Sequence, residues 1–160
     1  MTHEIVDGFL PDEYLHNLCV NICSQNFPWY FGDFVGTPAD INNCYFVHTV
    51  FNDKTVTSNF IDALNPLLNL IAPKELIKVR ILQYMGHDRL IEHQPHTDYD
   101  VEHKACVLYL NTNNGFTRLS DGTCVESIYN RALTFNGNTL HNSTNCTDEK
   151  RRLVLTVNYH

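Results

Sequence analysis

The chain has 160 residues, of which 43% are hydrophobic, and this length supports one domain with a single substantial core. Its formal net charge is −7 with only 11 lysines and arginines, which argues against a nucleic-acid backbone as the main partner because such binding needs basic surface. No apolar run is long enough to cross a membrane, and the N-terminus lacks the basic-then-apolar order of a signal peptide. We therefore expect no membrane association and a cytoplasmic location, in a bacterium or a host cell, with the six cysteines as free thiols.

The N-terminal part begins with a strand pattern followed by a helix pattern. Residues 3–10 predict a short strand that ends in a turn. A helix should then run from Pro11 to about Cys23, because proline and acidic residues occupy its first turn and apolar residues give it one apolar side. Residues 26–40 are rich in aromatic residues, glycine and proline and predict an irregular loop. Within it, residues 29–34 are our candidate for substrate contact, and a wall of the core is the alternative.

A second strand and a second helix complete the first 75 residues. Residues 45–51 have strong strand composition. Residues 58–71 predict a helix with Ser58 or Asn59 as its cap. Pro66 should kink this helix or divide it in two, because proline lacks the backbone N–H that a helix interior needs.

The remainder of the chain has the pattern of short strands separated by turns. The sequence NNG at 113–115 predicts a hairpin turn, and DG at 121–122 predicts a turn between two paired strands. The predicted strands are residues 77–84, 104–111, 116–119, 124–127, 131–136 and 153–159. Two helices and about seven strands predict a mainly β protein with N-terminal helices, built as a double-sheet jelly roll. We expect one domain over 1–160, with helical support in about 1–75 and the jelly-roll core in about 76–160.

The residues with the clearest chemical meaning are His96 and Asp98, which are separated by one residue. In an extended segment, residues i and i+2 point to the same face, so this imidazole and this carboxylate can converge on one metal ion. His141 follows the strand-like run 132–135 and is the best candidate for a third ligand. Two histidines and one carboxylate on one face of an octahedral ion leave three positions open, an arrangement typical of non-heme Fe(II) oxygenases.

The metal hypothesis competes with other readings of the same residues. The chain has nine histidines, so an H-x-D pair can arise by chance. His103 lies in a polar stretch and is expected to be solvated. A cupin-like metal-binding domain and a non-catalytic jelly-roll binding module are the alternative functions, although the usual cupin cluster of two histidines two apart plus a glutamate is not found. Two histidines and a carboxylate also suit a zinc hydrolase, but nothing in the sequence marks its general base.

The order of features along the chain resembles that of a known enzyme family. Tyr84 precedes His96 and Asp98, and His141 is followed about ten residues later by Arg151-Arg152 at the start of the last strand. This order is similar to that of the 2-oxoglutarate/Fe(II)-dependent dioxygenases, particularly the small prolyl-4-hydroxylase-like branch of bacteria and phages. The resemblance covers about residues 77–159, half of the chain, and the opening sequence IVDGFLPDEY is also similar.

The resemblance implies a double-stranded β-helix in which His96, Asp98 and His141 hold Fe(II). It also implies 2-oxoglutarate as cosubstrate and O2 as oxidant, and it allows a role for ascorbate. A basic residue on the last strand should pair with the distal carboxylate of 2-oxoglutarate. We favour Arg152, because alternation places it with small and polar residues, whereas the alternative, Arg151, shares its face with apolar residues suited to packing between layers.

Two further residues are site candidates, Tyr84 from the resemblance and Asn111 from its place at the end of a strand. Tyr84 matches the tyrosine that several relatives place beside the cosubstrate, and an amphipathic tyrosine at a strand end is the alternative. Asn111 either bonds near the metal or caps its strand. The chain departs from the common pattern by carrying Asn158 where relatives often have an aromatic residue, and by having one glycine, Gly115, where two are usual.

The resemblance implies hydroxylation of an unidentified substrate, either a protein side chain or a small molecule, with release of succinate and CO2. Asp98 favours hydroxylation, because halogenating relatives replace this carboxylate with a small residue that leaves room for chloride. A modified nucleotide is disfavoured by the charge, and the sequence indicates no oligomeric state.

Overall fold

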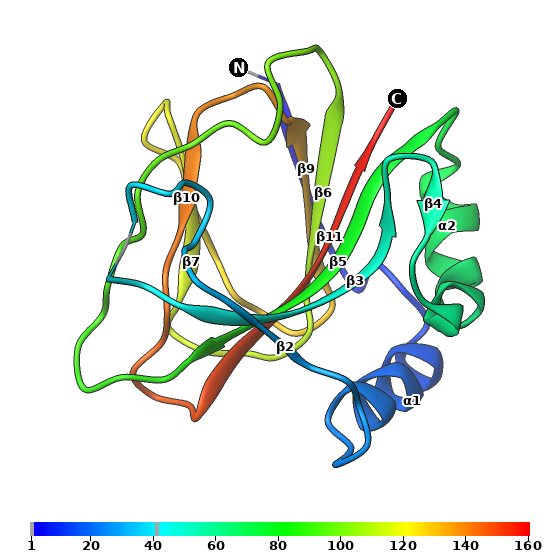
Figure 1. The fold of residues 1–160 in the computed structure, drawn as a ribbon, viewed down its shortest axis with the longest axis horizontal. Coiled ribbons are helices and arrows are strands. Elements are labelled where there is room, and N and C mark those ends of the chain that lie inside the picture. The colour runs from blue at the N-terminus through cyan, green and yellow to red at the C-terminus, as the bar shows by residue number, and fades with distance from the viewer. Residues whose placement is uncertain (1, 41) are drawn as a thin grey trace.

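Two antiparallel sheets form the framework of the computed structural model, which describes residues 2–40 and 42–160 (Figure 1). The large sheet has the strand order β1 (His3–Asp7), β9 (Arg131–Asn136), β6 (Lys104–Tyr109), β11 (Arg151–Tyr159), β5 (Leu76–Met85), β3 (Tyr45–Asn52) and β2 (Tyr30–Gly32), with β4 (Thr55–Val56) paired to β3. The small sheet has the order β10 (His141–Ser143), β7 (Phe116–Leu119) and β8 (Cys124–Glu126). The predicted mainly β, antiparallel architecture is confirmed.

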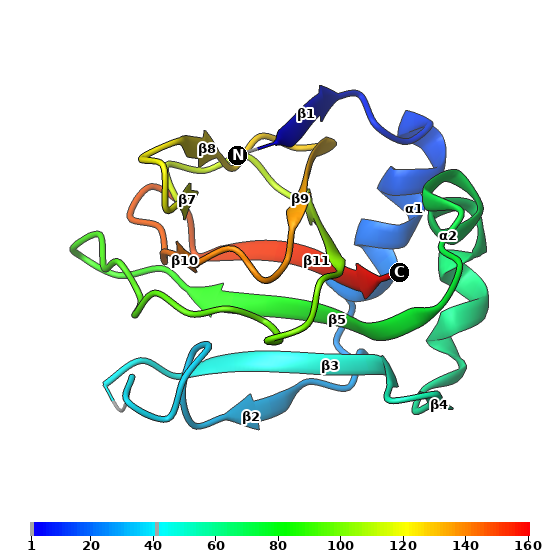
Figure 2. The same ribbon diagram turned by 90° about the horizontal axis from the view of Figure 1, so that it is seen from above.

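The helices lie on the opposite side of the molecule from the small sheet (Figures 1 and 2). Helix α1 spans Asp12–Ile22, the 3-10 helix η1 spans Asn59–Leu64, and α2 spans Asn65–Ile71. The Ser58 hydroxyl accepts a hydrogen bond from the Phe60 N–H at 3.1 Å, which is the predicted cap. Pro66 lies in the first turn of α2, where no N–H is needed, and this separates η1 from α2. In the described part of the chain, no helix is both long and apolar enough to cross a bilayer.

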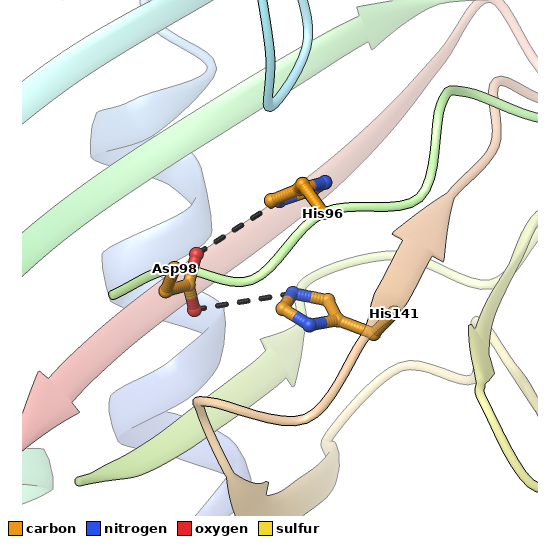
Figure 3. A group of neighbouring side chains, drawn as sticks. All are labelled: His96, Asp98 and His141. Atoms are coloured by element: carbon orange, nitrogen blue, oxygen red, sulfur yellow. Dashed lines mark ion pairs between the residues drawn. The ribbon is translucent and has the colours of Figure 1, made fainter. Parts of the chain in front are cut away.

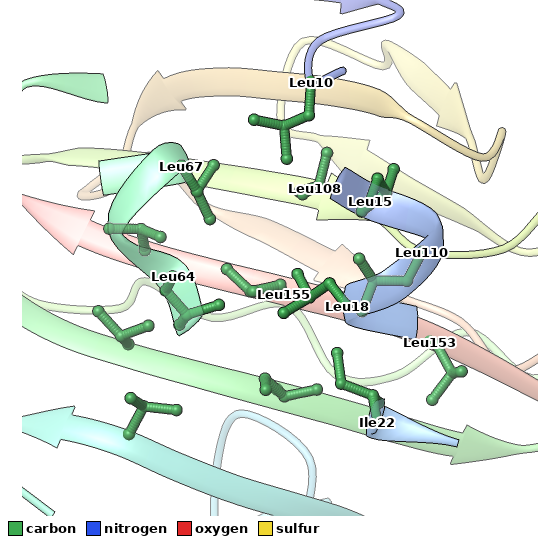
Figure 4. Close-up of a cluster of buried hydrophobic side chains, with 14 of the residues drawn as sticks. Leu10, Leu15, Leu18, Ile22, Leu64, Leu67, Leu108, Leu110, Leu153 and Leu155 are labelled. Carbon is green, nitrogen blue, oxygen red and sulfur yellow. The ribbon is translucent and has the colours of Figure 1, made fainter. Parts of the chain in front are cut away.

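Strand alternation divides the buried side chains between two cores. Outward-facing residues of the large sheet, such as Ile81 and Leu155, pack against leucines of the helices, among them Leu15 and Leu64 (Figure 4). Inward-facing residues of the same strands form a second core between the two sheets. That second core contains Val35, Leu82, Tyr84, Ala105, Val107, Tyr109, Leu119, Val125, Leu133, Phe135 and Val154. The candidate site lies on this inner side.

The first 75 residues contribute strands as well as helical support. Residues 30–32 were expected in an irregular loop but form β2, because Tyr30 pairs with Val47 at the edge of the large sheet. Strands β1 and β3 also belong to this sheet, so the boundary near residue 75 does not separate helices from strands.

The turn at 113–115 does not close a hairpin, contrary to the sequence-based prediction. Strand β6 pairs with β9 and β11, whereas β7 pairs with β10 and β8, so the turn carries the chain from the large sheet to the small one. Gly115 is needed there for space: a Cβ would lie 2.5 Å from the Asn145 carbonyl oxygen and 2.6 Å from Arg152 Cδ. The predicted pairing of β7 with β8 around the turn at Gly122 is confirmed.

The outer core provides a stability prediction. Leu155 is fully buried between β11 and the helices, so Leu155→Ala should lower the free energy of unfolding by about 2–5 kcal/mol, through lost burial and the cavity left behind. Urea titration followed by circular dichroism would measure the change. Leu70→Ala is the matched control, because Leu70 on α2 is 53% exposed and its truncation should change the unfolding free energy by less than about 0.5 kcal/mol. Equal effects of the two substitutions would contradict this description of the core.

Candidate metal centre

His96 and His141 are brought together by backbone pairing. The His96 N–H donates to the His141 carbonyl at 2.9 Å, and the His141 N–H donates to the His96 carbonyl at 2.9 Å. The two imidazole centroids are consequently 4.7 Å apart. Asp98 follows two residues later, with Oδ1 3.9 Å from His96 Nε2 and Oδ2 3.9 Å from His141 Nε2 (Figure 3). One donor atom from each residue lies within 4.8 Å of the others, close enough for a single ion to bind all three.

Backbone carbonyls orient the two imidazoles. His141 Nδ1 lies 2.8 Å from the Thr139 carbonyl oxygen, and His96 Nδ1 lies 3.3 Å from the Gln94 carbonyl oxygen. A carbonyl oxygen can only accept, so each neutral ring carries its hydrogen on Nδ1 and directs the Nε2 lone pair at the centre. Burial, followed by the neighbouring His141, lowers the pKa of His96, which favours the neutral form that metal binding requires.

Gly36 allows the chain to pass directly against one of these rings. Its φ is +73°, a conformation that favours glycine, and a Cβ at this position would overlap the His96 ring at Nδ1. Gly36 and Val35 line the cavity beside the triad. Within the expected contact segment, residues 29–34, Trp29 packs against the helix-side core, and residues 30 and 31 belong to β2 and are 62% and 61% exposed. The residues that line the cavity, Val35 and Gly36, directly follow this segment.

Asp98 has a second set of contacts that the sequence did not predict. Burial acts to raise its pKa, but His141, Arg80 and a 2.8 Å hydrogen bond from Asn158 Nδ2 outweigh this and hold the pKa of Asp98 below its usual range. The same Asn158 nitrogen lies 3.3 Å from His103 Nε2. His103 Nδ1 is 2.8 Å from the Val101 carbonyl, which leaves Nε2 of the neutral ring as an acceptor for the second amide hydrogen.

His103 was expected to be solvated, and this expectation is wrong, because the side chain is buried. Its polar neighbours in sequence gave no sign of burial. The only available signal was Asn158, because the resemblance led us to expect an aromatic residue at this position. An amide on the inner face of the last strand needs polar partners, and Asp98 and His103 supply them.

Arg152 is fully buried on the inner face of β11. Its guanidinium donates to the Ser127 hydroxyl at 2.6 Å, the Thr144 carbonyl at 3.2 Å and the Thr117 hydroxyl at 3.2 Å, all of them neutral groups. None of the ion pairs among the described residues involves Arg152. A buried cation without a counter-charge is costly, so this position is electrostatically suited to an anionic ligand.

The structure separates the remaining predicted site residues into two groups. Tyr84 is buried, lines the same cavity as the triad and Arg152, and lies 5.5 Å from the Arg152 guanidinium, measured to the ring centroid. Arg151 points the other way and donates to Gln83 at 3.0 Å. Asn111 is outside the cavity lining: its amide donates to the Arg151 carbonyl and accepts from the Leu153 N–H, both at 2.8 Å. The strand-capping alternative therefore describes Asn111.

Comparison with known proteins supports the fold. Neither a protein-family model nor a curated protein matches the sequence. Among solved structures, the α-ketoglutarate-dependent epimerase SnoN of nogalamycin biosynthesis matches with a TM-score of 0.69 at 15% identity, over 98% of this chain and 75% of that one. The viral collagen prolyl hydroxylase of Paramecium bursaria Chlorella virus-1, in complex with 2-oxoglutarate, matches with a TM-score of 0.63 at 15% identity, over 99% and 95%.

A bacterial enzyme gives the same result. A prolyl-4-hydroxylase from Pseudomonas putida matches with a TM-score of 0.65 at 15% identity, over 99% of this chain and 92% of that one. At this level of identity the likeness establishes the fold. The chain has the jelly-roll fold of 2-oxoglutarate-dependent oxygenases, as the sequence resemblance implied.

The contact between Asn158 and Asp98 provides a prediction for metal binding. Asn158→Ala removes the hydrogen bond that orients the carboxylate, so the affinity for Zn(II) or Co(II) should fall about 10- to 100-fold in calorimetric titrations. Asn138→Ala is the control, because Asn138 is exposed and the hydrogen bond given for it uses its backbone N–H, which the substitution keeps. An unchanged affinity in a folded Asn158→Ala protein would show that this amide does not support the centre.

Proposed function

We propose that this protein is a 2-oxoglutarate- and Fe(II)-dependent dioxygenase that hydroxylates a protein side chain or a small molecule and releases succinate and CO2. One observation carries the proposal: a His-Asp-His triad lines the same cavity as a fully buried arginine that forms no ion pair with any described residue. A metal-binding module without 2-oxoglutarate would need the triad, but it would have no anionic ligand to offset the cost of burying the charge of Arg152.

The triad fits a catalytic metal ion. His96, Asp98 and His141 would hold Fe(II) through two neutral nitrogens and one carboxylate oxygen, with vacant positions left for small ligands. When bound, Fe(II) together with 2-oxoglutarate and O2 supplies the oxidative C–H chemistry that protein side chains lack. The lowered pKa values of His96 and Asp98 keep both side chains in their ligating forms at neutral pH.

The inner end of the cavity fits the cosubstrate. Arg152 would pair with the distal carboxylate of 2-oxoglutarate, because its planar guanidinium matches a carboxylate in two parallel hydrogen bonds. Burial raises the pKa of Tyr84, so its hydroxyl stays protonated and can donate to the same carboxylate. Leu82, Val107 and Val154 line the walls between, and their apolar side chains exclude water from the site.

We place the remaining features in the same context. Residues 1–160 would form one oxygenase-like domain with helical support. The net charge of −7 fits a peptide, protein or small-molecule substrate better than a nucleic acid. Free thiols at all six cysteines fit a reducing compartment, so we propose a cytoplasmic location.

The triad can be tested by substitution at Asp98. Under anaerobic conditions, Fe(II) and 2-oxoglutarate should together produce a weak visible charge-transfer band, and in air the protein should release succinate. Asp98→Ala should abolish both signals because it removes a ligand. Asp100→Ala, an exposed carboxylate two residues away, should leave both unchanged. A protein that binds the metal but never develops the band would instead be a cupin-like binding module.

The role of the buried arginine can be tested against its neighbour. Arg152→Gln should raise the apparent KM for 2-oxoglutarate by about 10- to 100-fold, the size expected for a lost charge-assisted hydrogen bond. Arg151→Gln should change it by less than about 2-fold, because Arg151 contacts Gln83 on the opposite face. Succinate release measured across 2-oxoglutarate concentrations gives both values, and the reverse order would transfer the role to Arg151.

A further inference from the structure

Three buried polar atoms without partners lie together beside the candidate metal centre. They are Arg80 Nε on β5 and Thr156 Oγ1 and Asn158 Oδ1 on β11, and none has a hydrogen-bond partner among the described residues. Thr156 stands directly opposite Arg80 in the strand register, and Asn158 stands opposite Lys78. Buried polar groups are normally paired. Arg80 and Thr156 both line the cavity of the triad, so their unpaired donor atoms indicate a place where a polar ligand binds.

The same place has an excess of positive charge. Arg80 is largely buried, with its side chain 22% exposed, and its nearest carboxylate is Asp98 Oδ1 at 4.0 Å. Lys78 Nζ lies over the Tyr99 ring, 5.8 Å from its centroid. Burial first and then repulsion by the charge of Arg80 lower the pKa of Lys78. Among the described residues, Arg80 forms its ion pair with Asp98 and Lys78 forms none, so metal binding by Asp98 leaves neither cation with a carboxylate of its own.

A small polar pocket opens at this point. It is lined by Gly36, Lys78, Arg80, His96, Thr97, Asp98 and Tyr99, and it shares four of these residues with the cavity of the triad. Arg80 therefore reaches both the pocket and the cavity. The pocket is well separated from Arg152. Arg80 stands opposite Thr156, and Thr156 lies four residues from Arg152 on β11, which corresponds to roughly 13 Å along a strand.

We propose that this pocket binds a carboxylate of the substrate, so that the enzyme acts on small organic acids held by Arg80 and Lys78 beside the metal. The inference rests on the proposed function, in which Asp98 is committed to the metal and Arg152 to 2-oxoglutarate. Arg80 and Lys78, which both line the pocket, neutralise the carboxylate. The two arginines mark opposite ends of one cavity, with one carboxylate for each end.

Nuclear magnetic resonance of the arginine Nε–H group tests this directly. The protein is loaded with Zn(II), which binds without turnover, and then saturated with 2-oxoglutarate; calorimetry follows each step. The Arg80 signal is assigned by its absence from Arg80→Gln. Propionate should then shift this signal, and its matched neutral amide, propionamide, should not.

The affinity for propionate should depend on the two basic residues. Arg80→Gln should weaken propionate binding about 10- to 100-fold, the loss expected for a charge-assisted hydrogen bond, and Lys78→Gln should weaken it in the same direction. Arg89→Gln is the control, because Arg89 is an exposed arginine on a loop and should leave the affinity unchanged. If Arg80→Gln does not fold, the loss of propionate affinity in Lys78→Gln, measured by calorimetry, retains the test.

The outcomes separate this inference from the proposed function. If 2-oxoglutarate alone shifts the Arg80 signal fully and propionate adds nothing, the pocket serves the cosubstrate, and the substrate assignment is overturned while the proposed function stands. If neither compound shifts the signal, the carboxylate pocket is overturned. If Zn(II) or 2-oxoglutarate does not bind in the calorimetric steps, both proposals fail together.

Discussion

The two backbone hydrogen bonds between His96 and His141 are the constraint on which the candidate site depends. They join a loop that follows β5 to the first residue of β10, across 45 positions of sequence, and they fix the register between the two imidazoles. A shift of one residue would send one ring to the opposite face, because side chains alternate along paired extended segments. Asp98 falls into place as a consequence, since it lies two residues beyond His96 on the same side.

The buried charge of Arg152 affects the folding stability of the whole protein. Three neutral oxygen acceptors solvate the guanidinium, but no carboxylate compensates its charge within the described residues. The desolvation of this cation therefore offsets part of the stability that the two cores contribute. A ligand that brings a negative charge binds only the folded form and recovers that cost, so the cavity links ligand binding to folding stability.

Local patterns predicted the parts of this structure that depend on local physics. Alternation along the last strand placed Arg152 on the inner face and Arg151 on the outer one, and the capping and proline rules located the break between η1 and α2. Long-range contacts were not accessible in this way. The sequence NNG at 113–115 is typical of a hairpin turn, but glycine is required at position 115 because Arg152 approaches it closely. A local sequence pattern cannot predict such a contact. His103 is buried for a similar reason, because its partner Asn158 is 55 residues away.

The segment that carries His96 also pairs with β10, the edge strand of the small sheet. Bridges from Glu92 to Thr144 and from His96 to His141 give β10 a neighbour on the side away from β7. Without that neighbour, the free N–H and C=O groups of β10 would be a template for pairing with strands of other molecules. The loop that supplies two of the three candidate ligands thus also covers an edge strand that could otherwise pair with another molecule. An ion bound by both His96 and His141 would hold the loop in this position.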